Sequence, residues 1–537
     1  MWRTVTPAVF VFAAFFQPVI AAAQFSLQAW AAKRAEAVEA FRAARFRDAE
    51  ALGREALALA GPNPNEAVAT SANDLGLIFN EEAKYADAAA QFEHALAIES
   101  KFFPADSPTT AAVYNNLGGA DYRLGKFADA DRAYRRAAEI FDLTDNSSNT
   151  QFIAALSNYG TLCYQMGRYQ DADLLYTRAM RLGEKALPES DPLLIRSING
   201  LSLVRGALGQ YAESEALVRR ALDTLTAHLG PQSAAVANSL EFLGHLYELQ
   251  SRYAEAEPVL RRGFDICAST LGKSHPQCVE TLNALATALR HAGSLSEAEA
   301  SYSEALAETE KTLGRDHPSI ASLLNNMAEV YIAQANYKDA LPLLLRARSI
   351  MERTVGPQHA DVASIVANIA TVYAAKHKFK EAEDLYRQAL AIDVKIFGER
   401  SAGVARDFHN LGSMYSAMGR QNEAEVHLAR ALTIYEQMFG PGHISEALTI
   451  GNLAEVYRHE KRYEESATAY RNAIALREKT MPPDDTRWIG LLQGYASVCR
   501  ALEQYAEAEK AEVRVTRIRV KNALTASKGR GPIDPLH

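Results

Sequence analysis

The chain has 537 residues, of which 48% are hydrophobic and 23% are charged, the balance of a globular protein rather than a disordered one. Its formal net charge of −8 excludes the broad basic field expected of a protein that binds nucleic acid. Length alone would predict about three or four domains, but a regular period runs through nearly the whole chain and predicts one elongated solenoid.

Residues 1–23 differ in composition from the rest of the chain. Arg3 is their only charged residue, residues 8–16 form an apolar run, and Ala21, Ala22 and Ala23 offer a small-residue cleavage site. Because the run is too short to span a bilayer, the segment predicts a signal peptide cleaved near Ala23 and an exported protein, periplasmic or secreted. The alternative is a buried N-terminal cap helix. No other apolar run approaches the length of a membrane span.

Residues 322–363 show the unit from which the following chain is built. In the first half, small and apolar residues share one helical face: Leu324, Met327, Ala328 and Tyr331. In the second half the same spacing gives Ala340, Leu344, Ala347 and Ile350. The link at residues 334–336 is too short for anything but an antiparallel helix pair, and Gly356 stands where the second helix should end.

This helix pair recurs every 42 residues. Most copies open the second helix with an aromatic residue: Tyr85, Phe127, Tyr169, Tyr211, Tyr253, Tyr337, Phe379, Tyr463 and Tyr505, with Leu295 and Gln421 in the other two. Three residues later every copy has Ala or Ser, and nine residues before the aromatic position every copy has Gly, Ala or Ser. With an earlier copy at Phe46, the pattern predicts an all-α fold of about twelve antiparallel helix pairs over residues 24–525. Residues 526–537 lack the period and are predicted to form a disordered tail.

The pattern resembles the tetratricopeptide repeat, which has a small residue and Tyr in its first helix, then Ala, an aromatic residue and Ala in its second. The 42-residue length and the strings LNNMAEVY (324–331), AEDLYRQALAI (382–392) and LGRDHPSIA (313–321) look like the kinesin-light-chain variety in particular. The resemblance covers about residues 27–524 and implies a right-handed α-solenoid, a tetratricopeptide superhelix. It implies no particular ligand, because this scaffold serves many partners.

Four histidines at first sight suggest a metal site. His275, His317, His359 and His443 each fall at the start of a first helix, in separate repeats, where sister copies have Ser or Asp. One metal ion would need all its ligands within a few ångströms, so we interpret these histidines as helix caps and predict no metal or other cofactor.

The four cysteines fall into two groups. Cys163 and Cys499 occupy a slot that Tyr fills in sister copies, so we predict that they are buried. Cys267 and Cys278 bracket the turn between two helix pairs and could form a disulfide in an oxidising compartment. Because helix geometry could also hold their Cα atoms too far apart, the sequence leaves this bond open.

The first helices of stacked pairs are expected to line a concave groove. In tetratricopeptide domains the residue two before the small position faces that groove, and here it is often Asn: Asn116, Asn158, Asn326, Asn368, Asn410 and Asn452. An amide can both donate to and accept from a peptide unit of any sequence, which favours peptide binding. The equally weighted alternative is that these side chains tie neighbouring helices together.

Side chains nearer the ends of the first helices vary more and are expected to set specificity. Tyr122, Arg123 and Tyr164 could stack on a ligand in the N-terminal part of the groove. In the C-terminal part, four cationic side chains could attract an acidic segment or a C-terminal carboxylate: Arg406, Arg458, His459 and Arg500.

The sequence therefore predicts an exported, non-enzymatic scaffold that binds a peptide segment or protein surface in its concave groove. An enzyme is disfavoured because no segment of domain size lies outside the repeats. The alternative function is a structural component that forms homo-oligomers or organises an assembly through its convex face or edges.

Overall fold

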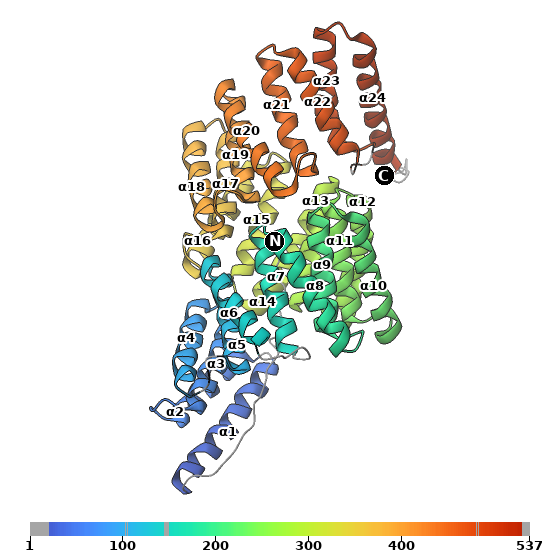
Figure 1. The fold of residues 1–537 in the computed structure, drawn as a ribbon. Helices are drawn as coiled ribbons and strands as arrows, with labels where there is room; N and C mark the ends of the chain where they lie inside the picture. The colour runs from blue at the N-terminus through green and yellow to red at the C-terminus, as the bar shows by residue number, and fades with distance from the viewer. Residues whose placement is uncertain are drawn as a thin grey trace, which may run out of the picture. The chain divides into compact units, whose positions relative to one another are not determined.

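The computed structural model describes residues 21–43, 45–102, 104, 106–143, 150–479, 481 and 483–528. These described residues form 24 α-helices and one short 3-10 helix, without any strand (Figure 1). The predicted signal peptide, apart from residues 21–23, lies outside the described residues, as do residues 529–537 of the predicted tail. Among the described helices, none combines the length and the apolar composition that crossing a bilayer would take.

In chain order the helices are α1 (Ala21–Arg42), α2 (Phe46–Ala60), α3 (Glu66–Glu81), α4 (Tyr85–Phe102), α5 (Pro108–Arg123), α6 (Phe127–Leu143), α7 (Thr150–Gln165), α8 (Tyr169–Ala186), α9 (Pro192–Ala207), α10 (Tyr211–Leu229), α11 (Ala234–Leu249) and α12 (Tyr253–Leu271). They continue with α13 (Pro276–Ala292), α14 (Leu295–Leu313), α15 (Pro318–Ala333), α16 (Tyr337–Thr354), α17 (Ala360–Ala375), α18 (Phe379–Phe397), α19 (Ala402–Ala417), α20 (Gln421–Phe439), η1 (Ile444–Glu446), α21 (Ala447–His459), α22 (Tyr463–Glu478), α23 (Trp488–Ala501) and α24 (Tyr505–Lys528).

The helices form two compact units. Of the described residues, the first unit contains those up to Leu246 together with Glu257–Ile365, and the second contains Tyr247–Ala256 together with those from Val366 onward. Within each unit the two helices of a pair pack together, as α3 with α4 and α19 with α20. Each pair also packs on the next, as α4 on α5 and α20 on α21, and neighbouring first helices touch, as α5 with α7 and α19 with α21. This is the predicted all-α solenoid of paired helices.

Small residues at the repeat positions allow the helices of a pair to pack closely. The alanines three residues after the aromatic position are completely buried: Ala88, Ala130, Ala172, Ala256, Ala298, Ala340, Ala382, Ala424 and Ala508. On the first helix, a Cβ atom added to Gly160 would lie 2.9 Å from the ring of Tyr176, so the glycine makes room for that ring. A larger side chain there would overpack the pair, as the sequence predicts.

The four histidines cap helices, as predicted. The Nδ1 atom of each lies close to the backbone N–H two residues further on, at 3.3 Å for His275, 3.2 Å for His317, 3.1 Å for His359 and 3.3 Å for His443. Each imidazole therefore satisfies one of the free N–H groups of a helix start, which confirms the capping interpretation.

The structure joins Cys267 and Cys278 in a disulfide, with their Cα atoms 5.4 Å apart. Cys267 lies near the end of α12 and Cys278 at the start of α13, so the short turn at Gly272 brings the two side chains together. Cys163 and Cys499 are free thiols and are completely buried, as predicted.

Glu99 of α4 makes the stability of the first unit depend on pH. Its side chain is 7% exposed. Burial raises the pKa of its carboxyl from 4.5 to about 7, while a hydrogen bond with Thr110 opposes that rise. The native state therefore holds the proton more tightly than the unfolded chain does, and stability falls as the pH rises from about 4.5 to about 7.

We expect Glu99→Gln to remove this effect, because a glutamine amide does not ionise. The variant should match the wild type at about pH 4 and exceed its free energy of unfolding by about 1–3 kcal/mol at about pH 8. Urea unfolding at both pH values measures the difference. An equal change at the two pH values would show that the carboxyl does not titrate in this way.

Candidate functional site

The six groove asparagines, which we call the amide row, lie on first helices and are half-buried: Asn116, Asn158, Asn326, Asn368, Asn410 and Asn452. Three of them repeat one contact in the first unit. The Nδ2 atom donates to the Oδ1 atom of an asparagine 43 residues earlier, at 2.9 Å in each case: Asn116 to Asn73, Asn158 to Asn115, and Asn326 to Asn283. In the second unit Asn452 instead donates to Ser413 Oγ at 2.8 Å and lies 3.3 Å from His409 Nε2.

These contacts connect the first helices of successive repeats, which is what the tying interpretation predicts. They do not use all of an amide, which has two N–H donors and an oxygen with two lone pairs. One bond between repeats also holds the amide in a defined orientation. A ligand would then meet side chains that have already lost most of their rotational freedom, which favours binding.

Asp74 takes the amide-row position in α3 and is used differently. It is 8% exposed, and Arg34 Nε of α1 donates to its Oδ2 at 2.5 Å. Burial raises the pKa of this carboxyl although Arg34 opposes the rise. The ion pair joins α1 of the first helix pair to α3 of the second. The side chain at the amide-row position of α3 is therefore already engaged in a contact within the protein.

The predicted aromatic side chains pack within their own repeats. The Tyr122 ring stacks on Phe127 with ring centroids 5.5 Å apart, and Tyr164 meets Tyr169 edge-on at 5.4 Å. Both tyrosines are half-buried. Each therefore rests on the aromatic residue that opens the second helix of its pair, which fixes the ring at the end of the first helix.

Arg123 lies among carboxylates and tyrosines. Burial acts to lower the pKa of its guanidinium, but Tyr85, Tyr122, Glu280 and Glu81 together raise it. Of these groups, the carboxylates of Glu280 and Glu81 favour the positive charge of Arg123.

Arg406 is bound to two buried carboxylates. Its Nη2 atom lies 3.1 Å from Asp393 Oδ2 and 3.1 Å from Asp407 Oδ1, and the two aspartate side chains are 3% and 0% exposed. Burial acts to lower the pKa of Arg406, but the two carboxylates raise it overall. Because these two carboxylates already neutralise Arg406, its charge no longer supports the prediction that it attracts an acidic ligand.

The remaining predicted cations also face carboxylates. Arg458 pairs with Glu455 at 2.7 Å, and His459 Nε2 lies 3.9 Å from the same carboxylate. Arg500 pairs with Glu512 of the following helix at 2.7 Å. The side chains of these pairs are 30–54% exposed, so the pairs contribute little to stability, and a ligand could still replace them.

Sequence reasoning missed Arg196 of α9, which donates through Nη2 to Asn158 Oδ1. It stands four residues before Gly200, which takes the amide-row position in its helix. The available signal was the repeat itself, because Arg406 occupies the same position in α19, four residues before Asn410.

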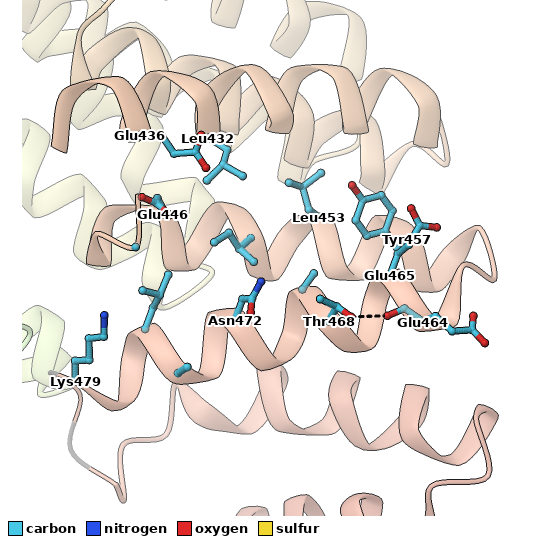
Figure 2. Close-up of a pocket in the computed structure, with 15 residues that line it drawn as sticks. Leu432, Glu436, Glu446, Leu453, Tyr457, Glu464, Glu465, Thr468, Asn472 and Lys479 are labelled. Atoms are coloured by element: carbon cyan, nitrogen blue, oxygen red, sulfur yellow. Dashed lines mark hydrogen bonds between the residues drawn. The ribbon is translucent and has the colours of Figure 1, made fainter. Parts of the chain in front are cut away.

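A pocket of about 720 Å³ lies among α20, α21 and α22 in the second unit (Figure 2). From α21 it is lined by Ile450, Leu453 and Tyr457, whose spacing places them on one helical face. Asn452 lies on the opposite side of α21, because successive residues of an α-helix are about 100° apart. The polar side chains that line the pocket include Glu436, Glu446, Glu464, Glu465, Thr468, Asn472 and Lys479. Of the described residues that line this pocket, none was predicted from the sequence.

A family model described as tetratricopeptide repeat matches residues 67–143, 109–185, 151–227, 193–269, 235–311, 277–353, 319–393, 361–437 and 440–519. No curated protein matches the chain.

Several solved structures are similar to parts of the chain. Repeats from Podosopora anserina, described as "kinesin light chain nearly identical TPR-like repeats", are 27% identical, cover 37% of this chain and 94% of their own, and have a TM-score of 0.31. BtubC (BKLC) from P. vanneervenii is 24% identical, with coverages of 43% and 91% and a TM-score of 0.34. A Rap protein complexed with competence and sporulation factor is 15% identical, with coverages of 70% and 100% and a TM-score of 0.47.

Proposed function

This chain belongs to the tetratricopeptide repeat family, and from that premise we propose that it is an exported, non-enzymatic scaffold that binds a peptide segment or protein surface along the first helices of its repeats. The fold itself suggests interaction with other proteins. The observation that carries the finer proposal is the amide row, with half-buried amides held at regular intervals by bonds between repeats.

The chemistry of the amide row suits an extended polypeptide. A peptide backbone offers an N–H and a C=O at each residue, and an asparagine amide can pair with both. The bonds between repeats keep these amides oriented before a partner arrives, so binding loses less side-chain entropy. Because the amides pair with the peptide backbone, they do not distinguish the side chains of the peptide. A scaffold of this kind would obtain its specificity from residues next to the amide row.

Export is part of the proposal for two reasons. Residues 1–23 have the composition of a signal peptide. The bond between Cys267 and Cys278 is of a kind that persists in oxidising compartments and is rare in reducing ones.

We expect the amide row, rather than the bonds that it makes, to be needed for partner binding. One triple variant replaces Asn116, Asn158 and Asn326 with Ala. The matched control replaces their partners Asn73, Asn115 and Asn283 with Ala, which breaks the same three hydrogen bonds and leaves the amide row in place. A partner isolated from the native host should bind the first variant at least about tenfold more weakly than the control, because each lost hydrogen bond contributes about 1 kcal/mol.

Both variants lose the three bonds between asparagines, and the first also loses the bond that Arg196 donates to Asn158, so the first should unfold at a slightly lower temperature than the control. If both variants lose the partner equally, the amides serve only to tie helices together and the proposal is wrong.

Protein isolated from the native host also tests export, because the first residue of the mature chain should be Gln24 after cleavage of the signal peptide. Arg406 is left unchanged in these variants because it neutralises buried carboxylates.

The alternative is a structural component that assembles through its other faces. It is favoured by the pocket on the side of α21 opposite Asn452, and by the exposed apolar side chains Leu143, Leu174 and Val426. Full retention of the partner by both triple variants would support this alternative.

A further inference from the structure

An ion pair between the second helices of successive repeats recurs along the chain. An arginine nine residues after the start of a second helix pairs with an acidic residue 36 positions earlier, on the preceding second helix. Four repeats make this pair: Arg178 with Asp142, Arg220 with Glu184 at 2.8 Å, Arg346 with Glu310 at 2.6 Å, and Arg514 with Glu478 at 2.7 Å.

In two of these repeats the arginine also covers an aromatic ring on the first helix that lies between the two second helices. The guanidinium carbon of Arg178 is 4.9 Å from the ring centroid of Phe152, and that of Arg514 is 4.1 Å from the ring centroid of Trp488. The guanidinium is thus held by a carboxylate on one side and by a ring on the other.

The repeat formed by α21 and α22 lacks this arginine. Asn472 takes its position, whereas Glu436, 36 residues earlier, keeps the acidic position. Glu446 stands where the ring would be, because it precedes Trp488 by 42 residues. In the described part of the chain, Glu436 has no ion-pair partner. This repeat therefore has two carboxylates around a position at which other repeats place a guanidinium.

The vacant position opens into the pocket of about 720 Å³ among α20, α21 and α22, which Glu436, Glu446 and Asn472 all line. Ala469 also lines it, at a position where four other repeats have leucine: Leu175, Leu217, Leu343 and Leu385. The apolar side chains that line the pocket include Leu432, Leu453 and Leu476. Such a lining suits the methylene groups of a long basic side chain, whose charged end can then meet the carboxylates.

The electrostatics at one end of the pocket favour a cation. Figure 2 shows Glu436 and Glu446 at this end, with Lys479 on the side of α22. Glu446 is 3% exposed, and burial raises the pKa of its carboxyl. The charge of Glu436 raises this pKa further, although the backbone N–H groups of His443 and Gly442 and the charge of Lys479 lower it. Lys479 itself is exposed and makes no ion pair with another described residue, so a second cation can still approach the two carboxylates.

We propose that this pocket binds an arginine side chain of a protein partner and thereby completes the ion pair that the repeat lacks. The guanidinium pairs with Glu436 and approaches Glu446, while apolar residues next to the arginine contact the leucines of the pocket. Arginine suits the position better than lysine, because its planar fork of donors fills the same position in four other repeats. The site lies on the side of α21 opposite Asn452, so it is separate from the amide row and adds a second binding function.

The test uses the full chain and three fluorescein-labelled, amidated peptides in which two leucines flank one variable residue. This residue is arginine, its neutral analogue citrulline, or lysine. By fluorescence anisotropy at low ionic strength, the wild type should bind the arginine peptide about tenfold more tightly than the citrulline peptide, as expected for hydrogen bonds between charged groups. The lysine peptide should bind more weakly than the arginine peptide.

Glu436→Gln should remove the preference for arginine over citrulline, because it removes the carboxylate and keeps the size of the side chain. The matched control is Glu478→Gln, at the same position one repeat later, where Arg514 of the protein already fills the site. The control should keep the preference.

Asn472→Arg should also remove the preference, because it restores the arginine that other repeats have and lets the protein pair with Glu436 itself. This variant should unfold at the wild-type temperature or above, so that lost binding cannot come from a folding defect. Its control is Gln388→Arg, which adds the same charge at the equivalent position of α18 and should leave the preference intact.

The proposal is overturned if the wild type shows no preference for arginine over citrulline, or if Glu436→Gln or Asn472→Arg keeps it. It is also overturned if either control loses the preference. A lysine peptide that binds as tightly as the arginine peptide would contradict the assignment to a guanidinium. None of these variants changes a residue of the amide row, so failure here leaves the groove proposal untouched.

Discussion

Replacing Arg406 with alanine is expected to lower the free energy of unfolding by about 3–5 kcal/mol near neutral pH, because it leaves buried charge without compensation. The side chains of Asp393 and Asp407 are 3% and 0% exposed, and Arg406 binds both. Their negative charges would remain close together in a region with little water. Equilibrium unfolding in urea, with circular dichroism as the signal, measures the loss.

The pH dependence gives a second readout of the same prediction. Burial raises the pKa of Asp407 to about 6, and Arg406 opposes that rise. Because the folded-state pKa lies above the ordinary value of 3.8, stability decreases as the pH rises. Without Arg406 the pKa should rise further, so the variant should lose less stability at about pH 5 than at about pH 8.

Arg205→Ala is the control for this prediction. Its partners Asp173 and Glu213 are 28% and 62% exposed, so losing these pairs should change stability by less than about 1 kcal/mol. Comparable losses for Arg406→Ala and Arg205→Ala would show that the buried aspartates do not need their arginine.

Replacing Trp488 with alanine should cost about 3–5 kcal/mol, because it empties a large volume in the last helix pair. Trp488 begins α23 and is 0% exposed. Its neighbours in the core come from both helices of the pair and include Val515 and Ile518 of α24. Arg514 covers the indole ring, with its guanidinium carbon 4.1 Å from the ring centroid.

The loss should be concentrated at the C-terminal end, because a repeat contacts only its neighbours. In hydrogen exchange, α23 and α24 should lose protection first, while α19 and α20 keep theirs. Val513→Ala on α24 is the control, since Val513 is 52% exposed and should change stability by less than about 0.5 kcal/mol. A uniform loss of protection over the whole second unit would contradict this local account.

Most of the fold could be predicted from the 42-residue period. The unit expected in residues 322–363 is found as α15, α16 and the start of α17. The predicted small positions are buried, the histidines cap their helices, and the family model confirms the tetratricopeptide resemblance. These features depend on the helical face and on helix ends, and both are local properties of the sequence.

Some local features still escaped prediction. Ala335, in the link between α15 and α16, has φ 57°, and His377 at the equivalent position also has φ 57°. This left-handed conformation is usually taken by glycine, as it is at Gly293 in another link. The equivalent position in other links is Gly125, Gly167, Gly209, Gly293 or Gly419, so the turn at Ala335 and His377 is indicated by comparison between repeats and not by the residues themselves.

The candidate site was predicted only in part. The amide row and its repeat positions follow from the sequence, but the two interpretations of the row could not be separated without knowing what lies next to each amide. The structure shows that Asn326 meets Asn283, a residue 43 positions earlier and on the preceding first helix. The pocket among α20, α21 and α22 gave no sequence signal because three separate helices contribute its lining.

The sequence by itself determined where each helix begins, which face it buries and how often the pair recurs, because these follow from spacing along one chain segment. Only the tertiary structure decided which charges are neutralised. Arg196 and Arg406 have the same position in their repeats, yet Arg196 bonds to the Asn158 amide whereas Arg406 pairs with the carboxylates of Asp393 and Asp407. The strength of an electrostatic interaction depends on distance and burial in the folded chain, and a repeat period specifies neither for side chains that come from different helices.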